Sequence, residues 1–340
     1  MTPFGEIERR RRNARSSYTD IKKHYVRING WLPVFRLYSA SRGKDIRYLT
    51  LCAKYAIDVR YFRQKGLLAY DAAQKLYPTV TFVEKDTQDY AIIAEGLGTT
   101  RLGIRGDLED ILVRPEHNPE LARRLGETFP YDIINLDFTG EVVRGDDPPY
   151  SQTIRAIEKV MELQSQANCE RWHLFLTFRA CPETANHEAD DELCNIIEDN
   201  LRNAGAQEAY GERALPRELE QTDYCEFLRI GIAKFLASSA SNRGYACTLD
   251  GSYTYPRNPG EGQPEYRIVK LIVGFAAIRR GRNLPNPERA RTAYQACVPQ
   301  IFQSEAVNVF EKLQSRVIRQ GILDDIGPVL EELREQNIVG

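Results

Sequence analysis

Long apolar segments are missing from this 340-residue sequence. No run approaches the ~18 consecutive apolar residues that a membrane-spanning helix requires. The first residues, MTPFGEIERRRRNAR, have no apolar stretch behind their charges, so we expect no secretory signal. These absences exclude the helical membrane proteins and predict a soluble, cytoplasmic protein.

Metal and hydrolase motifs are also missing. The seven cysteines are odd in number and include no CxxC pair, so we interpret them as reduced, mostly buried thiols. Cys169, His173, Cys181 and His187 are too loosely spaced for a typical zinc site, and we predict two core cysteines, two incidental histidines and no bound metal. The absence of a Walker motif, of HExxH and of GxSxG gives a hydrolase little support.

Charge is distributed unevenly along the chain. Hydrophobic residues make up 42% and charged residues 28%, as in globular proteins, and the formal net charge is −2. Residues 1–65 nevertheless hold 16 Lys and Arg against 5 Asp and Glu, whereas the remainder holds 30 against 43. A basic front end on an acidic body predicts contact with a polyanion or with the acidic surface of a partner.

Short apolar runs alternate with amphipathic patterns between residues 45 and 205. The predicted strands are 46–54, 79–86, the start of 101–112, 131–140 and 171–180, and the predicted helices are 58–77, 88–98, 119–129, 151–166 and 188–205. Hydrophobic period, capping residues and glycine stops support these assignments. Strands that alternate with helices in this way predict βαβ units and a mainly parallel, Rossmann-like α/β sheet.

The pattern changes after residue 225. A helix is predicted over 225–240, followed by two long strands, 245–256 and 265–280, which we expect to form an antiparallel hairpin at one edge of the sheet. Residues beyond 285 are predicted to be helical, with apolar side chains near helical spacing at Val307, Val309, Phe310, Leu313, Val317 and Ile318. These side chains either pack on the main domain or contact a partner or a second copy. The predicted domains are therefore a basic segment, 1–44, a Rossmann-like domain, 45–280, and a helical extension, 281–340.

Five parallel βα units followed by a helix and an antiparallel hairpin resemble the class I S-adenosylmethionine-dependent methyltransferases over residues 45–280. In that family the second strand ends in an acidic residue that holds the cofactor ribose, and Glu84 stands at this point in TVTFVEKD. An Asp near the adenine commonly follows the third strand, and Asp107 occupies that place. The resemblance also implies cofactor contacts from Cys52 and Ala53 after the first strand.

The fourth strand, YDIINLDFTG, ends in polar residues. The resemblance implies that Asp137 orients the methyl acceptor, with Asn135 and Thr139 beside it. Arg179 follows the fifth strand, where it could contact a phosphate or carboxylate or pair with Asp137. Because ligands of open α/β sheets bind outside the carboxyl ends of the strands, we expect these side chains to lie at one edge.

Two features bear on whether the resemblance extends to catalysis. No glycine occurs between Gly43 and Gly66, where the family usually has a glycine-rich cofactor loop, and a β-carbon at a close approach obstructs the ligand or redirects the backbone. The cofactor site is therefore either retained in altered form or lost from a degenerate scaffold. Asp147 to Tyr150 spell DPPY, the signature of methyltransferases that act on adenine amines. It follows no buried strand directly, so we interpret it as a loop before the helix at 151–166.

Basic and aromatic residues are interleaved at the N-terminal end. The basic residues that we predict to contact nucleic acid are Arg9, Arg10, Arg11, Arg12, Arg15, Lys22, Lys23 and Arg27, and the nearby aromatics are Tyr25, Trp31, Phe35 and Tyr38. Cations neutralise phosphates, and aromatic rings stack on exposed bases. Alternatively, the aromatics pack in the core beneath a solvated face, or the cations meet an acidic partner.

The leading hypothesis is a methyltransferase-like protein that acts on or with nucleic acid. If it is active, it transfers a methyl group from S-adenosylmethionine. The competing hypothesis is an inactive subunit with the same fold, which binds nucleic acid or partner proteins without chemistry.

Overall fold

The computed structural model describes residues 20–43, 45–68, 79–97, 103–142, 151–182, 187–256, 269–280 and 287–336. The chain divides into two compact units. The first contains residues 1–107 and 309–340, and the second contains residues 108–308. Each unit is described separately.

Three short parallel strands form the sheet of the first unit, in the order β3-β2-β1. They are β1 (Tyr48–Thr50), β2 (Val80–Glu84) and β3 (Gly103–Arg105), and the helices α4 (Ile57–Gln64) and α5 (Thr87–Gly96) follow β1 and β2. Gly103 is required by packing, because a Cβ at this position would lie 2.5 Å from the Phe82 ring and 2.6 Å from the Tyr90 ring. The pairing of β1 with β2 and of β2 with β3 is parallel, which confirms the parallel arrangement predicted for the first three strands.

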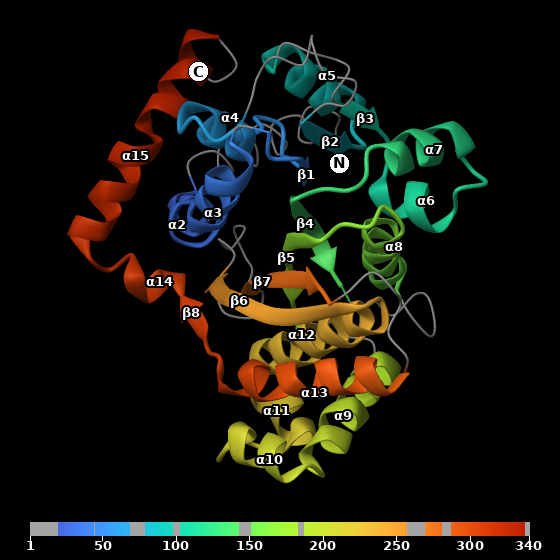
Figure 1. Ribbon diagram of the computed structural model, residues 1–340. Coiled ribbons are helices and arrows are strands. Elements are labelled where there is room, and N and C mark those ends of the chain that lie inside the picture. The colour runs from blue at the N-terminus through green and yellow to red at the C-terminus, as the bar shows by residue number, and fades with distance from the viewer. Residues whose placement is uncertain are drawn as a thin grey trace, which may run out of the picture. The chain divides into compact units, whose positions relative to one another are not determined.

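N- and C-terminal helices pack together in the first unit (Figure 1). They are α2 (Ile21–Val26), the π-helix η1 (Arg27–Trp31), α3 (Leu32–Arg42), α14 (Val309–Lys312) and α15 (Arg316–Glu335). Phe35 of α3 stacks on Phe62 of α4 with ring centroids 3.7 Å apart and meets the edge of Tyr48 at 5.1 Å. These aromatic contacts join the N-terminal helices to the sheet of this unit.

Ion pairs connect α15 to α4. The carboxylate of Glu332 accepts hydrogen bonds from Arg60 and, at 2.5 Å, from Arg63. Asp325 pairs in the same way with Lys65 and accepts the hydroxyl of Tyr61. The Arg60 side chain is only 2% exposed, so the Glu332 carboxylate compensates a guanidinium charge that has little contact with water.

Five strands form the sheet of the second unit, in the order β4-β5-β7-β6-β8. They are β4 (Ile133–Glu141), β5 (Arg171–Ala180), β6 (Tyr245–Pro256), β7 (Val269–Arg279) and β8 (Ala306–Asn308). Strands β4 and β5 are parallel, whereas β7 is antiparallel to both β5 and β6. The predicted α/β fold, mainly parallel with an antiparallel hairpin, is confirmed, and its connections are those of a Rossmann-like sheet.

Helices cover the sheet of the second unit (Figure 1). They are α6 (Leu108–Val113), α7 (Pro119–Glu127), α8 (Gln152–Gln166), α9 (His187–Leu201), α10 (Ala204–Tyr210), α11 (Pro216–Thr222), α12 (Tyr224–Asn242) and α13 (Pro287–Gln303). The nearly continuous apolar sequence of α12 is explained by its position, since it contacts β6, β7 and α13 and is buried along most of its length.

The C-terminal prediction needs one correction. Residues near Val307 were predicted to lie in a helix, but β8 is a strand that pairs in parallel with β6. Val309 and Leu313 are buried as a packing role requires, whereas Phe310 and Val317 are 52% and 82% exposed. Within the described ranges, no helix has the length and apolar character needed to span a membrane.

Candidate functional site

Cys52 and Glu84 approach each other at the carboxyl ends of β1 and β2. The strands are neighbours, with Thr50 opposite Phe82, so the residues that follow them lie at the same edge. The Cys52 thiol is buried, and burial together with the nearby carboxylates of Asp58 and Glu84 raises its pKa well above the ordinary value. The thiol therefore stays protonated and apolar in character at neutral pH.

The Glu84 carboxylate is positioned to accept further hydrogen bonds. It is partly exposed and accepts the Asp86 backbone N–H at 2.8 Å. Burial raises its pKa, and Asp89 and Asp86 add to the rise. Asp86 itself caps α5, because its carboxylate accepts the N–H groups of Gln88 at 2.8 Å and Asp89 at 3.0 Å. Of the two acids Glu84 and Asp86, Glu84 is thus the one that we expect to be available to a ligand.

Asp107 lies just beyond β3, the neighbour of β2. Its carboxylate is 3.3 Å from the Lys85 amine, and the Lys85 side chain is 70% exposed. A pair this exposed contributes little to stability, so it holds Asp107 only weakly. The four residues predicted to bind the cofactor therefore lie at the carboxyl ends of three adjacent parallel strands, with Cys52 and Ala53 after β1, Glu84 as the last residue of β2 and Asp107 after β3.

The loop after β1 makes a left-handed turn without glycine. Ala56 has φ 44°, and its N–H donates to the Ala53 carbonyl at 2.7 Å. The Ala56 side chain is 1% exposed, so its methyl group points into the core, whereas Ala53 is exposed. The conformation that a glycine usually supplies is thus adopted by an alanine whose β-carbon packs inside the protein.

Asp58 fixes the start of α4 beside this loop. Its buried carboxylate accepts the Tyr48 hydroxyl at 2.6 Å and the Thr50 hydroxyl at 2.8 Å. Both donors belong to β1, so the strand and the helix on either side of the loop are tied together. Sequence reasoning missed this residue, although an acid in the first turn of a helix after a strand was visible in the sequence.

In the second unit, Asp137 was predicted at the end of its strand but lies in the middle of β4, as the last residue before the register with β5 shifts, and a cation lies beside it. Its carboxylate is 4.0 Å from the Lys270 amine, which also donates to the Phe138 carbonyl at 2.8 Å. Asn135, two residues earlier on the strand, is buried. Arg179 at the end of β5 is 3.8 Å from Glu141, so its ion pair is with Glu141. Sequence reasoning missed Lys270, which the hairpin brings to this edge.

The N-terminal aromatics and part of the basic segment are buried. Tyr25, Trp31, Phe35 and Tyr38 are all buried, as expected if these rings pack in the core. Arg27 is also buried, with its Nη1 2.9 Å from His24 Nδ1. Among the other residues predicted to bind nucleic acid, Lys22 is buried and Lys23 is half-buried. The remaining ones lie outside the described residues: Arg9, Arg10, Arg11, Arg12 and Arg15.

Several other predictions fall on residues that the structure does not describe. Asp147 to Tyr150 and the Thr139 side chain lie outside the described residues, as does the His187 side chain. Two of the residues weighed as zinc ligands have other partners: the Cys169 thiol donates to the Tyr131 carbonyl at 3.5 Å, and His173 Nε2 is 2.9 Å from Asp250. Within the described part of the chain, no group of three or more His, Cys, Asp or Glu residues could hold a metal ion.

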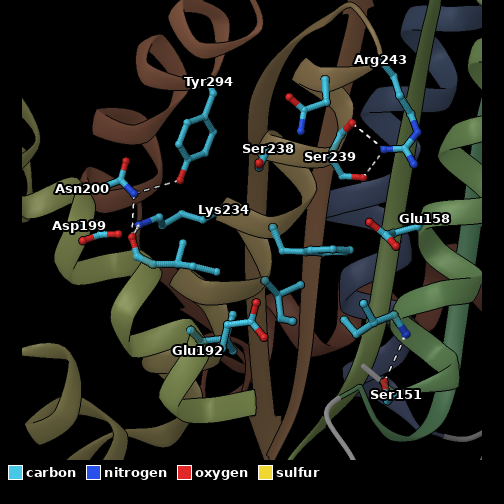
Figure 2. A pocket seen from close by; sticks show the side chains of 16 residues that line it. Ser151, Glu158, Glu192, Asp199, Asn200, Lys234, Ser238, Ser239, Arg243 and Tyr294 are labelled. Atoms are coloured by element: carbon cyan, nitrogen blue, oxygen red, sulfur yellow. Dashed lines mark hydrogen bonds between the residues drawn. The ribbon is translucent and has the colours of Figure 1, made fainter. Parts of the chain in front are cut away.

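Sequence reasoning also missed a pocket of about 420 Å³ in the second unit. Helices α8, α9, α12 and α13 line it (Figure 2). The Lys234 amine donates to the Ile196 carbonyl at 2.8 Å, and burial lowers its pKa to about 7. Beside it, Asn200 donates to the Tyr294 hydroxyl at 3.1 Å. A lysine inside the apolar segment CEFLRIGIAKFLASSA was the visible signal of an unusual environment.

Residues 104–269, just under half of the chain, match the model of the PP_RS20740-like family. This stretch includes Asp107, Asp137 and Arg179, as well as the parts of α8, α9 and α12 that line the pocket. No curated protein and no solved structure matches the chain.

Proposed function

We propose that the chain is a methyltransferase-like protein that acts on or with nucleic acid and binds S-adenosylmethionine at the strand ends of its first unit. The observation that carries the proposal is the arrangement of Cys52, Glu84 and Asp107 at the carboxyl ends of three adjacent parallel strands. Ligands of open α/β sheets bind at this edge. When bound, S-adenosylmethionine supplies an activated methyl group.

The residues at this edge fit a nucleoside ligand. Glu84 accepts the two ribose hydroxyls, since its carboxylate is partly exposed and the backbone N–H groups of Lys85 and Asp86 leave acceptor capacity on its two oxygens. Asp107 lies beside the adenine, and the buried Cys52 thiol offers an apolar contact. The left-handed turn at Ala56 buries its methyl group, which supports the proposal because this β-carbon of the glycine-free loop does not project into solvent.

The acceptor-orienting residues belong to the second unit. We assign this role to Asp137 and Asn135, with Arg179 contacting a phosphate of the substrate. The Asp137 carboxylate lies 4.0 Å from the Lys270 amine, and a carboxylate can accept hydrogen bonds from an amine or hydroxyl group of the methyl acceptor.

Calorimetric titration with S-adenosylmethionine tests the cofactor site. We expect wild-type protein to bind the ligand and Glu84→Gln to bind it about tenfold or more weakly, because a charged acceptor of two hydroxyls is lost. Glu95→Gln, an exposed carboxylate on α5 of the same unit, is the matched control. No heat from the wild type at millimolar ligand would contradict the proposal.

The nucleic-acid part of the proposal has a separate test. Binding of short DNA and RNA duplexes and single strands, measured against salt, should weaken steeply as salt rises, because phosphate neutralisation releases counterions. Substitution of Arg9 to Arg12 by alanine should reduce both the affinity and the salt slope. Affinity that is independent of salt would remove nucleic acid from the proposal.

An inactive binding subunit is the second candidate. It is favoured by the pairing of the predicted catalytic residues with neighbouring charges, Asp137 with Lys270 and Arg179 with Glu141. Transfer of a labelled methyl group to DNA or RNA separates the two candidates. Cofactor binding without transfer to either nucleic acid supports the inactive subunit.

A further inference from the structure

Three arginines of the second unit meet where α8, α12 and β7 end. Arg243 is the C-cap of α12, Arg279 is the last residue of β7, and Arg280 follows it. The Arg280 N–H donates to the Gly244 carbonyl at 2.9 Å. Arg279 Nη2 donates to the Ser165 carbonyl of α8 at 2.9 Å, and the Ser165 hydroxyl is 3.4 Å from the Arg243 carbonyl oxygen. These contacts make the three arginines neighbours, and together they form the arginine cluster.

Neutral oxygen atoms hold the two half-buried members of the cluster. Arg243 Nη1 donates to the backbone carbonyl and the hydroxyl of Ser239 at 2.8 and 2.7 Å (Figure 2). Arg279 Nη2 donates to the carbonyl and the hydroxyl of Ser165 at 2.9 and 3.0 Å, and its Nη1 is 3.4 Å from the Asn168 amide oxygen. The two guanidinium groups are thus fixed in place by acceptors that carry no charge of their own.

The helix ends compensate only part of the positive charge. The C-terminus of an α-helix carries the equivalent of about half a negative charge. Arg243 donates to a carbonyl in the last turn of α12, and Arg279 donates to one in the last turn of α8, so each keeps part of its charge. Arg280 is exposed, and its side chain has no hydrogen bond or ion pair with any residue that the structure describes.

No carboxylate of the described residues forms an ion pair with the cluster. Glu170 is adjacent, since its carbonyl accepts the Arg279 N–H at 2.7 Å, but its side chain is exposed and unpaired. Glu158 lines the same pocket as Arg243 without pairing with it. On the strand beside β7, Arg171 adds another positive charge at this end of the sheet. The guanidinium groups are therefore open to an anion from solvent.

We propose that the arginine cluster binds phosphate groups of a nucleic acid, as a contact in addition to the basic segment 1–44. This inference rests on the nucleic-acid part of the proposed function. A guanidinium group stays charged and presents paired N–H donors that match the oxygens of a phosphate. Arg279 lies over the Tyr245 ring at 5.3 Å, and this ring is buried and thus unavailable for base stacking. Contacts to phosphate alone carry no sequence information, so we expect binding without sequence preference.

Binding of short DNA duplexes to the full-length protein, measured against salt, tests the proposal. Each phosphate contact contributes about −0.9 to the slope of log K against log salt concentration. Arg280→Gln should therefore make the slope shallower by about 0.9, and the double variant Arg243→Gln with Arg280→Gln by about 1.8. At about 0.1 M salt, we expect the double variant to bind about tenfold or more weakly than the wild type.

Arg155→Gln is the matched control for Arg280→Gln. Arg155 is an exposed arginine of the same unit without a partner among the described residues, so its substitution removes the same charge. It lies on α8 ten residues before Ser165, which is about 15 Å along a helix. This separation exceeds the Debye length of about 8 Å at physiological salt, so we expect an unchanged slope. Circular dichroism of each variant separates loss of binding from loss of fold.

The outcomes distinguish this inference from the proposed function. Wild-type binding that persists with the same slope in the double variant, or an equal effect of Arg280→Gln and Arg155→Gln, overturns the role of the cluster alone. A wild type that binds no nucleic acid at any salt concentration removes the nucleic-acid part of the proposed function as well. Binding of poly-glutamate that is weakened by the double variant as much as binding of DNA would assign the cluster to an acidic protein and overturn the proposal.

Discussion

The strand ends of the two units differ in how their carboxylates are compensated. In the first unit, Glu84 is partly exposed and has no cation partner among the described residues, and burial raises its pKa. In the second unit, Asp137 lies 4.0 Å from Lys270, and Arg179 lies 3.8 Å from Glu141. A carboxylate without a cation remains available to ligand hydroxyls, whereas one beside a cation is held in place by it. This difference supports the proposed assignment of ligand binding to the first edge and of acceptor orientation to the second.

The largest effect is expected at Asp58, which supports the first edge. Asp58→Ala leaves the buried hydroxyls of Tyr48 and Thr50 without their acceptor, so we expect a loss of about 2–4 kcal/mol in the free energy of unfolding. Urea unfolding measures the loss. Glu95→Ala, on the exposed face of α5, should change stability by less than about 0.5 kcal/mol. Equal effects of the two substitutions would show that Asp58 does not support this edge.

The next effect concerns Lys234, a charge of the second unit that is buried without full compensation. Its folded-state pKa is about 7, below its ordinary value, so the unfolded state binds its proton more tightly. The contribution of Lys234 to stability is present at high pH and lost as pH falls through 7. Wild-type stability relative to Lys234→Met should therefore rise by about 2 kcal/mol from pH 6 to pH 8.5. A difference that does not change with pH contradicts the lowered pKa.

A smaller loss is expected at the second edge. Asp137→Ala removes the carboxylate beside the largely buried Lys270, and we expect a destabilisation of about 1–2 kcal/mol from the uncompensated amine. The double variant Asp137→Ala with Lys270→Met should recover part of this loss, because the buried charge is then absent. If the losses in free energy of unfolding from the two single substitutions add up to that of the double variant, the two groups do not interact.

The smallest effect is expected at Glu84. Burial raises the pKa of Glu84 in the folded state, so ionisation of this carboxyl destabilises the fold. This free-energy cost is fully present above the raised pKa and absent below the pKa of Glu84 in the unfolded chain. Glu84→Gln should thus leave stability at pH 7 unchanged or slightly higher, within about 0.5 kcal/mol. A clear destabilisation would mean that the charge of the carboxylate stabilises the fold, beyond the Asp86 N–H bond that a glutamine oxygen can also accept, and would weaken the contrast with Asp137.

The sequence predicted the strands well, because β-branched and aromatic runs placed Glu84 at the end of β2, whereas β4 continues past Asp137 to Glu141. It could not predict the partner of Asp137, since Lys270 reaches that edge only through the antiparallel pairing of β7 with β5. The left-handed turn at Ala56 was also beyond reach, because alanine rarely adopts this conformation.

The pocket was unpredictable for a similar reason. Its lining comes from α8, α9, α12 and α13, and each contributes only a few side chains to it. Helical periodicity identifies a buried face but does not say which faces leave a cavity between them. Val317 shows that helical spacing does not identify every buried face either, since its spacing fits a packed helix but the side chain is exposed.

The most direct test compares the response of Glu84→Gln and Asp137→Asn to S-adenosylmethionine in a thermal unfolding experiment. A ligand that binds only the folded state stabilises it by RT ln(1 + [L]/Kd), so at a fixed concentration the tighter ligand raises the melting temperature more. We predict that millimolar S-adenosylmethionine raises the melting temperature of the wild type and of Asp137→Asn by similar amounts and that of Glu84→Gln by clearly less. Equal shifts in both variants, or a shift lost only in Asp137→Asn, would contradict the assignment of the cofactor to the first edge.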